Sequence, residues 1–294
     1  MRGSKLNIML LFIAWLSISM ASVLVVLSGT SPEVCAFWRL LISFTVILCY
    51  SVVFDVEALS FKALSLRQAV KSMFSGVSLA LHFLLWMRSL FLIPVALSTT
   101  LVVTYPLINV PIERYVTQRK PSIRELLGLA LAFAGVVVAV RPYSSTTGGL
   151  EGVFLAVGGA VLAAIYFSLG RDLRVSGVKL TTYTILSYGF ASLTLLTYGL
   201  LNSVSLVPER TSSWVYLILL ALIPMLGGHT VMNYLLKHLK SYVVTSIALG
   251  EPLGASLLAA LFLGQVPSNE VFIGMALTLC GISITILYGG GSGS

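Results

Sequence analysis

Five ionisable side chains stand within long apolar stretches of this sequence, and they are the first candidates for chemistry. They are Arg39, His82, Arg88, His229 and Glu251. A charged side chain at the centre of a membrane-spanning helix costs about 2.5 to 3.5 kcal/mol on insertion scales, so a sequence keeps one there mainly for function. Groups of these types can bind a polar or charged solute, pair with one another, or transfer a proton.

Glu251 is the one acid among these five residues, and it directly precedes Pro252. Proline cannot donate a backbone hydrogen bond, so the helix is weakened where the carboxyl group lies. In the first half of the chain, Tyr105 precedes Pro106 in the same way. We expect both weakened points to line a polar cavity, where Glu251 binds a substrate ammonium or carries a proton. The alternative is a carboxyl group that hydrogen-bonds a neighbouring helix for packing.

The two deep histidines each share a helix face with a second side chain. His82 and Trp86 are four residues apart, as are His229 and Asn233, and residues four apart are neighbours on a helix. An imidazole exchanges protons near neutral pH, and Trp86 offers a flat apolar wall that attracts cations. We predict that both pairs line a solute pathway. Helix–helix hydrogen bonds for the histidines, and a lipid-interface position for Trp86, are the alternatives.

Arginine and aromatic side chains complete the predicted site. Arg39 and Arg88 lie near the outer ends of their apolar stretches, where a long side chain can reach the interface. We include Arg39 in the site, with interfacial anchoring or a structural clamp as the alternative for both arginines. Interface belts and packing explain the aromatic candidates equally well. The predicted substrate-binding residues are His82, Trp86, Tyr105, His229, Asn233, Glu251, Arg39, Trp15, Tyr166 and Tyr183.

The composition of the 294-residue chain places these residues in a membrane. Hydrophobic residues make up 57%, charged residues 10%, and the mean hydropathy is +1.00. A soluble domain carries roughly 25% charged residues, and disordered, collagen-like or coiled-coil chains require polar or strictly periodic sequence. The formal net charge of +8 is not gathered into one patch, which argues against a nucleic-acid partner.

The apolar stretches are long enough to span a bilayer. A helix needs about 20 mainly apolar residues to cross roughly 30 Å of hydrocarbon. We therefore predict an all-α integral membrane protein with ten transmembrane helices. The expected spans are 6–28, 33–54, 70–92, 95–116, 123–141, 150–170, 180–201, 213–236, 242–263 and 268–288.

Lysine and arginine are distributed unevenly between alternate connections. With the N-terminus inside, 14 of the 18 basic residues fall on the inner side, 2 fall outside and 2 lie within spans. Short cytoplasmic loops are enriched in positive charge. We therefore predict a multi-pass protein of a prokaryotic plasma membrane, in contact with membrane lipid, with both termini cytoplasmic.

The sequence contains an internal repeat with an offset of 146 residues. It aligns residues 99–135 with 245–281, and a shift by one residue also matches His82 with His229. Small residues that permit close helix packing recur in both copies. The matched glycines are Gly128 with Gly274, and Gly135 with Gly281.

An odd number of spans in each copy requires the second copy to enter the membrane from the opposite side. We predict two inverted five-helix repeats, at 1–146 and 147–288, while 289–294 looks like the remnant of an engineered linker. Inverted repeats are the architecture of many secondary transporters, whose sites lie near the midplane where the repeats meet.

Patterns for catalysis, cofactors and metals are missing from the sequence. Asp55 and Asp172 lie in predicted loops, which excludes a membrane-embedded aspartyl pair. The histidines are well separated, and the three cysteines, Cys35, Cys49 and Cys280, are scattered, so neither metal-ligand spacing nor a disulfide framework is present. No phosphate-binding loop is found. We predict no enzymatic activity, no cofactor and no metal.

Several short motifs, taken with the duplication, resemble the EamA-type drug/metabolite transporter superfamily. They are Trp15, Phe37-Trp38-Arg39, Gly250-Glu251-Pro252 and the proline-then-glycine closing segments. The resemblance covers nearly the whole chain and implies transport of amino acids and other small metabolites, often outward. The sequence departs from the family pattern at Thr117-Gln118 and at Gln265, where an acidic residue often stands.

These observations support one main hypothesis and two alternatives. The main hypothesis is a secondary carrier that exports small amphipathic metabolites, most of all amino acids, by alternating access, with proton coupling as a further hypothesis. A phosphosugar or nucleotide-sugar exchanger would need several deep basic residues, and Arg39 and Arg88 are the only lysine or arginine residues more than three residues from the end of a span. A passive channel or lipid scramblase would show a continuous polar stripe.

The charge distribution predicts the orientation of the loops. In a variant without Cys35, Cys49 and Cys280, the substitutions Ser144→Cys and Ser205→Cys should each react with a membrane-impermeant thiol reagent added to intact cells, and Ser65→Cys should not. The reason is the enrichment of positive charge on the cytoplasmic side. Labelling of the Ser65→Cys protein from outside would contradict this orientation.

Overall fold

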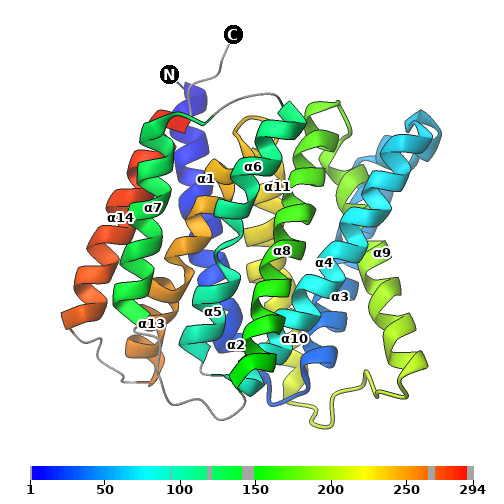
Figure 1. Cartoon of the computed structure of the whole chain (residues 1–294). Coiled ribbons are helices and arrows are strands. Elements are labelled where there is room, and N and C mark those ends of the chain that lie inside the picture. The colour runs from blue at the N-terminus through cyan, green and yellow to red at the C-terminus, as the bar shows by residue number, and fades with distance from the viewer. Residues whose placement is uncertain (1, 94, 118–120, 141–148, 264–268, 290–294) are drawn as a thin grey trace.

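The computed structural model describes residues 2–93, 95–117, 121–140, 149–263 and 269–289, and all regular structure in these ranges is helical. The helices run roughly side by side and form a single bundle (Figure 1). The first residues of α1 and the last residues of α14 lie at the same end of that bundle. We term this the inner end, and the opposite one the outer end. Gln118, Arg141, Ser144, Gln265 and most of the segment 289–294 fall outside the described residues.

The elements follow the expected spans closely, with short 3-10 helices at η1, η2 and η4 and a π-helix at η3. Their bounds are α1 (Arg2–Ser19), α2 (Ala21–Ser28), α3 (Pro32–Phe54), η1 (Val56–Leu59), η2 (Phe61–Ala63), α4 (Leu66–Leu92), α5 (Val95–Val102), α6 (Tyr105–Thr117), α7 (Ile123–Val140), α8 (Gly149–Val175), α9 (Leu180–Leu201), α10 (Ser213–Leu220), η3 (Ala221–Thr230), α11 (Val231–Leu235), α12 (Ser241–Thr245), η4 (Ser246–Gly250), α13 (Glu251–Leu263) and α14 (Asn269–Gly289).

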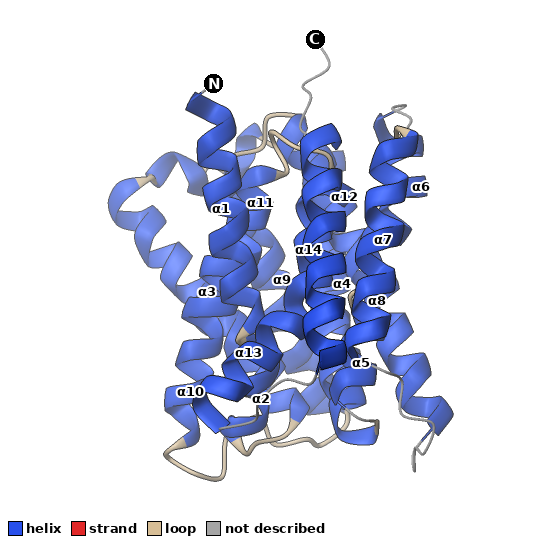
Figure 2. Cartoon of the chain, turned by 90° about the vertical axis from the view of Figure 1, so that its left-hand side faces the viewer, coloured by secondary structure: helices blue, strands red, loops and turns tan. Residues whose placement is uncertain are grey.

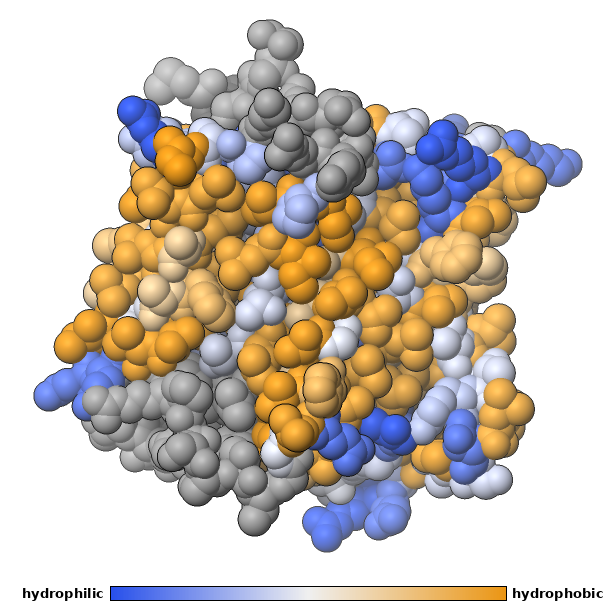
Figure 3. Space-filling model, in the orientation of Figure 1, coloured by the Kyte–Doolittle hydropathy of each residue, from blue (hydrophilic) through white to orange (hydrophobic). Residues whose placement is uncertain are grey.

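The outer surface of the bundle is that of a membrane protein. Within the described ranges, six continuous helical segments are long and apolar enough to cross a bilayer. They are Lys5–Ser28, Pro32–Phe54, Leu66–Leu92, Gly149–Val175, Leu180–Leu201 and Ser213–Leu235. Apolar residues cover the middle of the face that Figure 3 shows, and hydrophilic residues lie toward the inner and outer ends of the bundle. The prediction of an all-helical, multi-pass membrane protein is confirmed.

Polar caps fix the ends of several helices and the connection at the inner end. Ser31 caps α3, and Ser65 forms a capping box with Gln68 at the start of α4. Between these helices, Asp55 accepts hydrogen bonds from Lys179 at 3.2 Å and from Thr181 at 2.7 Å, which ties the connection to the start of α9. The hydrogen bond from Thr181 lowers the pKa of Asp55, so this anchor persists into acidic solution.

Two spans are interrupted at equivalent places in the repeat. The expected span 95–116 is divided into α5 and α6, and the α-helical part of 242–263 is interrupted by the 3-10 turn η4. In each case the new helix begins one residue before a proline, at Tyr105 and at Glu251. Because proline lacks the N–H group that would continue the ladder, the chain changes course just before it. The pattern therefore places Tyr105 and Glu251 at helix breaks, as the sequence predicts.

The matched glycines hold α7 against α14, which lie side by side in both ribbon views (Figures 1 and 2). A Cβ atom on Gly281 would lie 2.5 Å from the carbonyl oxygen of Gly128, and one on Gly135 would lie 2.7 Å from that of Gly274. The two helices thus exchange equivalent contacts and run in opposite directions. Only glycine permits backbones to approach this closely.

The glycine contacts lead to a stability prediction. Alanine in place of a helical glycine normally stabilises by about 0.5 to 1 kcal/mol. Gly281→Ala should instead lower the free energy of unfolding by about 1 to 3 kcal/mol, because the methyl group forces α7 and α14 apart. Gly149→Ala is the control, since no atom of the described residues lies within 4 Å of its Cβ position. Thermal unfolding in detergent measures both, and equal midpoints would refute the close-packing argument.

Candidate functional site

A small cavity lies inside the bundle, between the broken helices and α3 and α4. It is nearer the outer end, because Arg39 stands near the outer start of α3 and Trp86 near the outer end of α4. Its volume is about 20 Å³, which is room for about one water molecule. The lining residues are Ile18, Ala21, Arg39, His82, Phe83, Trp86, Val102, Tyr105, His229 and Glu251.

Arg39 brings a positive charge to this cavity. Its side chain is 1% exposed, and its guanidinium carbon lies 4.1 Å from the centre of the Phe83 ring. The Nε and Nη1 atoms have no hydrogen-bond partner among the described residues. The aromatic ring attracts the cation from one side but leaves the N–H donors unused. Arg39 can therefore offer hydrogen bonds and charge to an anionic group.

Glu251 brings a carboxyl group to the same cavity. It is the first residue of α13, directly after the 3-10 turn of η4, and its side chain is buried. The Oε1 atom has no hydrogen-bond partner within the described part of the chain. Arg39 and Glu251 both line the cavity, yet they are not among the ion pairs within 4.0 Å that the described residues form. A solute that enters between them would meet both the guanidinium group and the carboxyl group.

The two histidines meet at the cavity from different halves of the chain, with ring centres 6.4 Å apart. His82 lies 2.9 Å through Nδ1 from the carbonyl oxygen of Gly159 and stacks parallel to Trp86. His229 comes from the π-helix η3, a local geometry that is frequent at functional sites. Its Nδ1 atom and the Nε1 atom of Trp86 also lack partners among the described residues.

Four of the side chains that line this cavity thus hold buried polar atoms without a described partner. They are Arg39, Trp86, His229 and Glu251. Buried polar atoms are almost always hydrogen-bonded, and each that is not costs about 1 to 3 kcal/mol. Their concentration in one place indicates a site for a ligand or water. The chemistry offered is one cation, one carboxyl group, imidazole and indole donors, and aromatic walls.

The structure brings together six of the ten predicted site residues and places the other four elsewhere. Asn233 donates to the hydroxyl of Tyr166, and the hydroxyl of Tyr183 lies 2.7 Å from that of Ser75. Trp15 packs against η4 and α13, close to Gly250 and Gly254. These four do not line the cavity, and their part in binding stays a prediction.

Arg88 takes part in a separate contact near the outer end. It donates to Glu33 at 2.8 Å and also to the hydroxyl of Tyr198. Its side chain is 38% exposed, and these bonds connect α4 with α3 and α9. This is the structural clamp that the sequence analysis gave as the alternative reading.

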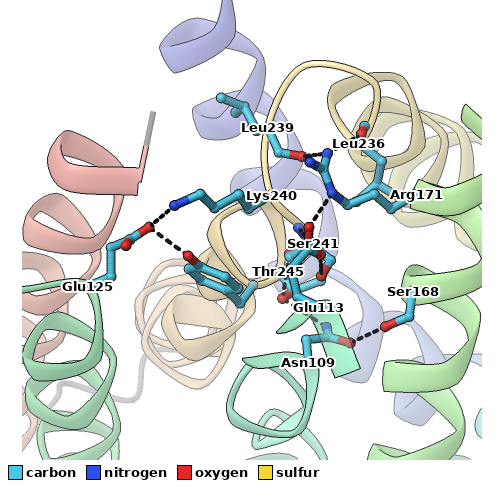
Figure 4. A network of polar contacts seen from close by, with 11 residues as sticks. Asn109, Glu113, Glu125, Ser168, Arg171, Leu236, Leu239, Lys240, Ser241 and Thr245 are labelled. Carbon is cyan, nitrogen blue, oxygen red and sulfur yellow. Dashed lines mark hydrogen bonds and ion pairs between the residues drawn. The ribbon is translucent and has the colours of Figure 1, made fainter. Parts of the chain in front are cut away.

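Sequence reasoning missed a network of polar contacts on the inner side of the cavity (Figure 4). Glu113 of α6 pairs with Arg171 of α8, and Glu125 of α7 pairs with Lys240 at 2.7 Å. Both acids lie in predicted spans, near their inner ends, and this position was the available signal. The pairing of two residues far apart in sequence leaves no local pattern.

The end of α8 needs a correction. The sequence analysis placed Arg171 and Asp172 beyond the span 150–170, whereas α8 continues to Val175. Arg171 is buried at 8% exposure, and Asp172 pairs with Lys71 of α4. Ion pairs with neighbouring helices satisfy these charges, so the helix need not end before them.

The fold and the site define a class of protein, a multi-pass helical membrane protein with a small polar cavity between interrupted helices. Such interruptions in membrane helices occur where they line cavities and are typical of transporters. The family model of EamA-like transporters matches residues 5–141 and 150–287. The chain belongs to the EamA-like transporter family, whose members are transporters and not enzymes, and the resemblance to drug/metabolite transporters is confirmed.

Individual relatives agree with this membership. An uncharacterised transporter from Archaeoglobus fulgidus is 29% identical over 192 residues, which cover 65% of this chain and 66% of that relative. One crystal structure of a protein superposes with a TM-score of 0.80, covering 97% of this chain and 98% of its own, at 18% identity. At that identity, the similarity shows the fold alone.

The unpartnered guanidinium leads to a stability prediction that separates function from structure. Replacing a buried charge that lacks partners by an apolar side chain is often neutral or stabilising. Arg39→Met should leave the free energy of unfolding unchanged or raise it by up to about 2 kcal/mol. Arg171→Met, which strands Glu113, should lower it by about 3 to 5 kcal/mol. A similar loss in both variants, measured by thermal unfolding, would make Arg39 a structural residue.

Proposed function

We propose that this chain is a secondary carrier that moves small zwitterionic or amphipathic metabolites, above all amino acids, by alternating access. Its direction would be outward, across a plasma membrane, with both termini cytoplasmic. Ten spans in two inverted five-helix repeats, 1–146 and 147–288, would provide the mechanism. Exchange of conformation between two similar halves turns an inward-open state into an outward-open one.

Three observations support the inverted repeat. The breaks before Pro106 and Pro252 occur at equivalent positions, and both flank the cavity. The equivalent helices α7 and α14 run antiparallel and exchange equivalent glycine contacts. The start of α1 and the end of α14 share one end of the bundle. An axis of two-fold symmetry in the membrane plane would produce all three.

The observation that carries the substrate proposal is that a guanidinium group and a carboxyl group line one cavity. A substrate carboxylate would take the free donors of Arg39, and its ammonium would face Glu251. Phe83, Trp86 and Tyr105 would enclose the apolar part. Charge-assisted hydrogen bonds are about twice as strong as neutral ones, so a zwitterion suits this arrangement well.

The alternatives fit the cavity less well. A phosphosugar or nucleotide sugar carries more than one negative charge. Among the residues that line the described cavity, Arg39 is the only lysine or arginine. A channel or scramblase needs a continuous polar path, whereas the cavity holds about 20 Å³. A metabolite would therefore require the helices to move apart, as alternating access demands. Protonation of Glu251 during the cycle would couple transport to a proton gradient.

Transport by purified protein in liposomes tests the proposal. A panel of amino acids, phosphosugars and nucleotide sugars should show uptake of one or more amino acids. Glu251→Gln should reduce that uptake by about tenfold or more, because a hydrogen bond to a charged group contributes about 1.5 to 3 kcal/mol. Glu57→Gln is the matched control, since Glu57 is 85% exposed and far from the cavity lining.

Two results would contradict the proposal. If the protein takes up phosphosugars or nucleotide sugars and no amino acid, it belongs to the exchanger class named as an alternative. Unchanged uptake in Glu251→Gln between pH 5.5 and 8 would remove the carboxyl group from both substrate binding and proton coupling.

A further inference from the structure

The inner side of the bundle is closed by a buried ion pair. Arg171 of α8 donates to Glu113 of α6, and its Nη1 atom also donates to the carbonyl oxygens of Leu236, at 2.7 Å, and Leu239. Ser241 donates to the same carboxylate through its backbone N–H, at 3.1 Å, and through its hydroxyl. The short connection between α11 and α12 is thereby held to two other helices.

A second ion pair holds the same connection from the other side. Glu125 of α7 accepts hydrogen bonds from Lys240 and from the hydroxyl of Tyr242, both at 2.7 Å. The side chain of Glu125 is 1% exposed, and that of Lys240 is 14% exposed. The two ion pairs therefore meet on a segment of seven residues, 236–242 (Figure 4).

Neutral hydrogen bonds extend the closure toward the cavity. Asn109 of α6 donates to Thr245 of α12 at 3.2 Å and accepts from Ser168 of α8 at 3.0 Å. The bonds from Arg171 to Leu236 and Leu239 lie within the second repeat. The other contacts join α6 and α7 of the first repeat to elements of the second. A route from the cavity to the inner end that passes between α6 or α7 and segment 236–242 must break them.

The repeat places uncharged residues at the positions that match both acids of the closure. With the offset of 146 residues, Glu113 corresponds to Ala259 and Glu125 to Val271. Likewise, Ser241 corresponds to Val95. Two symmetric halves would close both ends with equal strength, so these charges give the inner closure an advantage that the outer end does not receive from equivalent residues.

We propose that Glu113–Arg171 and Glu125–Lys240 form an inner gate that sets the resting state of this carrier. The proposal rests on alternating access as proposed above. With both pairs made, the cavity is shut from the inside, and loading from the cytoplasm requires segment 236–242 to move away from α6 and α7. A buried ion pair adds little net stability compared with apolar packing of the same volume. Such pairs are therefore better suited to a contact that forms and breaks during each transport cycle than to a permanent connection between helices.

The gate can be tested by thiol accessibility, which needs no substrate. In a variant without Cys35, Cys49 and Cys280, one reporter is Ser168→Cys. This position lies on the inner side of the cavity, beside Asn109. A second reporter is Ala21→Cys on the cavity wall. Inside-out and right-side-out vesicles are each treated with a membrane-impermeant thiol reagent, and the labelling rates are compared.

Glu113→Gln and Glu125→Gln, introduced separately, should open the inner end. Ser168→Cys should label about tenfold faster in inside-out vesicles, equivalent to about 1.4 kcal/mol, while Ala21→Cys labels more slowly in right-side-out vesicles. The opposite changes are required because opening one end closes the other. Glu57→Gln, which breaks an exposed ion pair at the same end, should change neither rate. A variant counts as folded when it elutes as a single species in size-exclusion chromatography and shows a cooperative thermal unfolding transition. One folded gate variant is enough for the test.

Two outcomes would overturn the gate. If neither rate changes in the folded variants, the ion pairs do not control access. If Ser168→Cys labels faster but Ala21→Cys is unaffected, the network is a local clamp and not part of a switch. Labelling that behaves as expected, together with no uptake of any amino acid, would keep the gate and reject only the substrate proposal.

Discussion

The structure depends on one constraint, the absence of water in the hydrocarbon layer. Every polar group buried there must find a partner within the protein or remain unsatisfied at a cost. Most buried polar groups of the described residues are paired, as Glu113 is with Arg171. Ten buried side-chain atoms of the described residues are exceptions, and five of them belong to residues that line one cavity: Arg39, Trp86, His229 and Glu251. The same rule that stabilises the bundle therefore identifies its site.

Interrupted helices explain how a continuous apolar bundle can contain such a site. Pro106 and Pro252 break their helices at equivalent points, and Tyr105 and Glu251 are delivered to the cavity by these breaks. Elsewhere the bundle is tightly packed, with the glycines of α7 and α14 in backbone contact. In the proposed mechanism, rigid packing on one side and broken helices on the other would allow the elements to move as units around the cavity.

In the proposed mechanism, sequence duplication would supply similar halves, and the differences between them would favour one state. The cavity is lined from both halves by His82 and His229, which agrees with the proposed inverted repeat. The acids Glu113 and Glu125 occur in one half only, and their partners lie in the other. A carrier with equal halves would favour neither side of the membrane, so charges placed on one half are a simple way to favour one state.

The sequence by itself determined the features that depend on local patterns. Apolar length, the prolines at 106 and 252, and charges isolated in apolar stretches indicated a helical membrane protein and six residues of the cavity wall. Only the tertiary structure decided that Tyr166, Tyr183 and Asn233 bond within the bundle, and that α8 carries Arg171 to Glu113. Those outcomes depend on distances between helices remote in sequence. A periodic pattern shows which face of a helix is polar, but not which neighbouring helix that face meets.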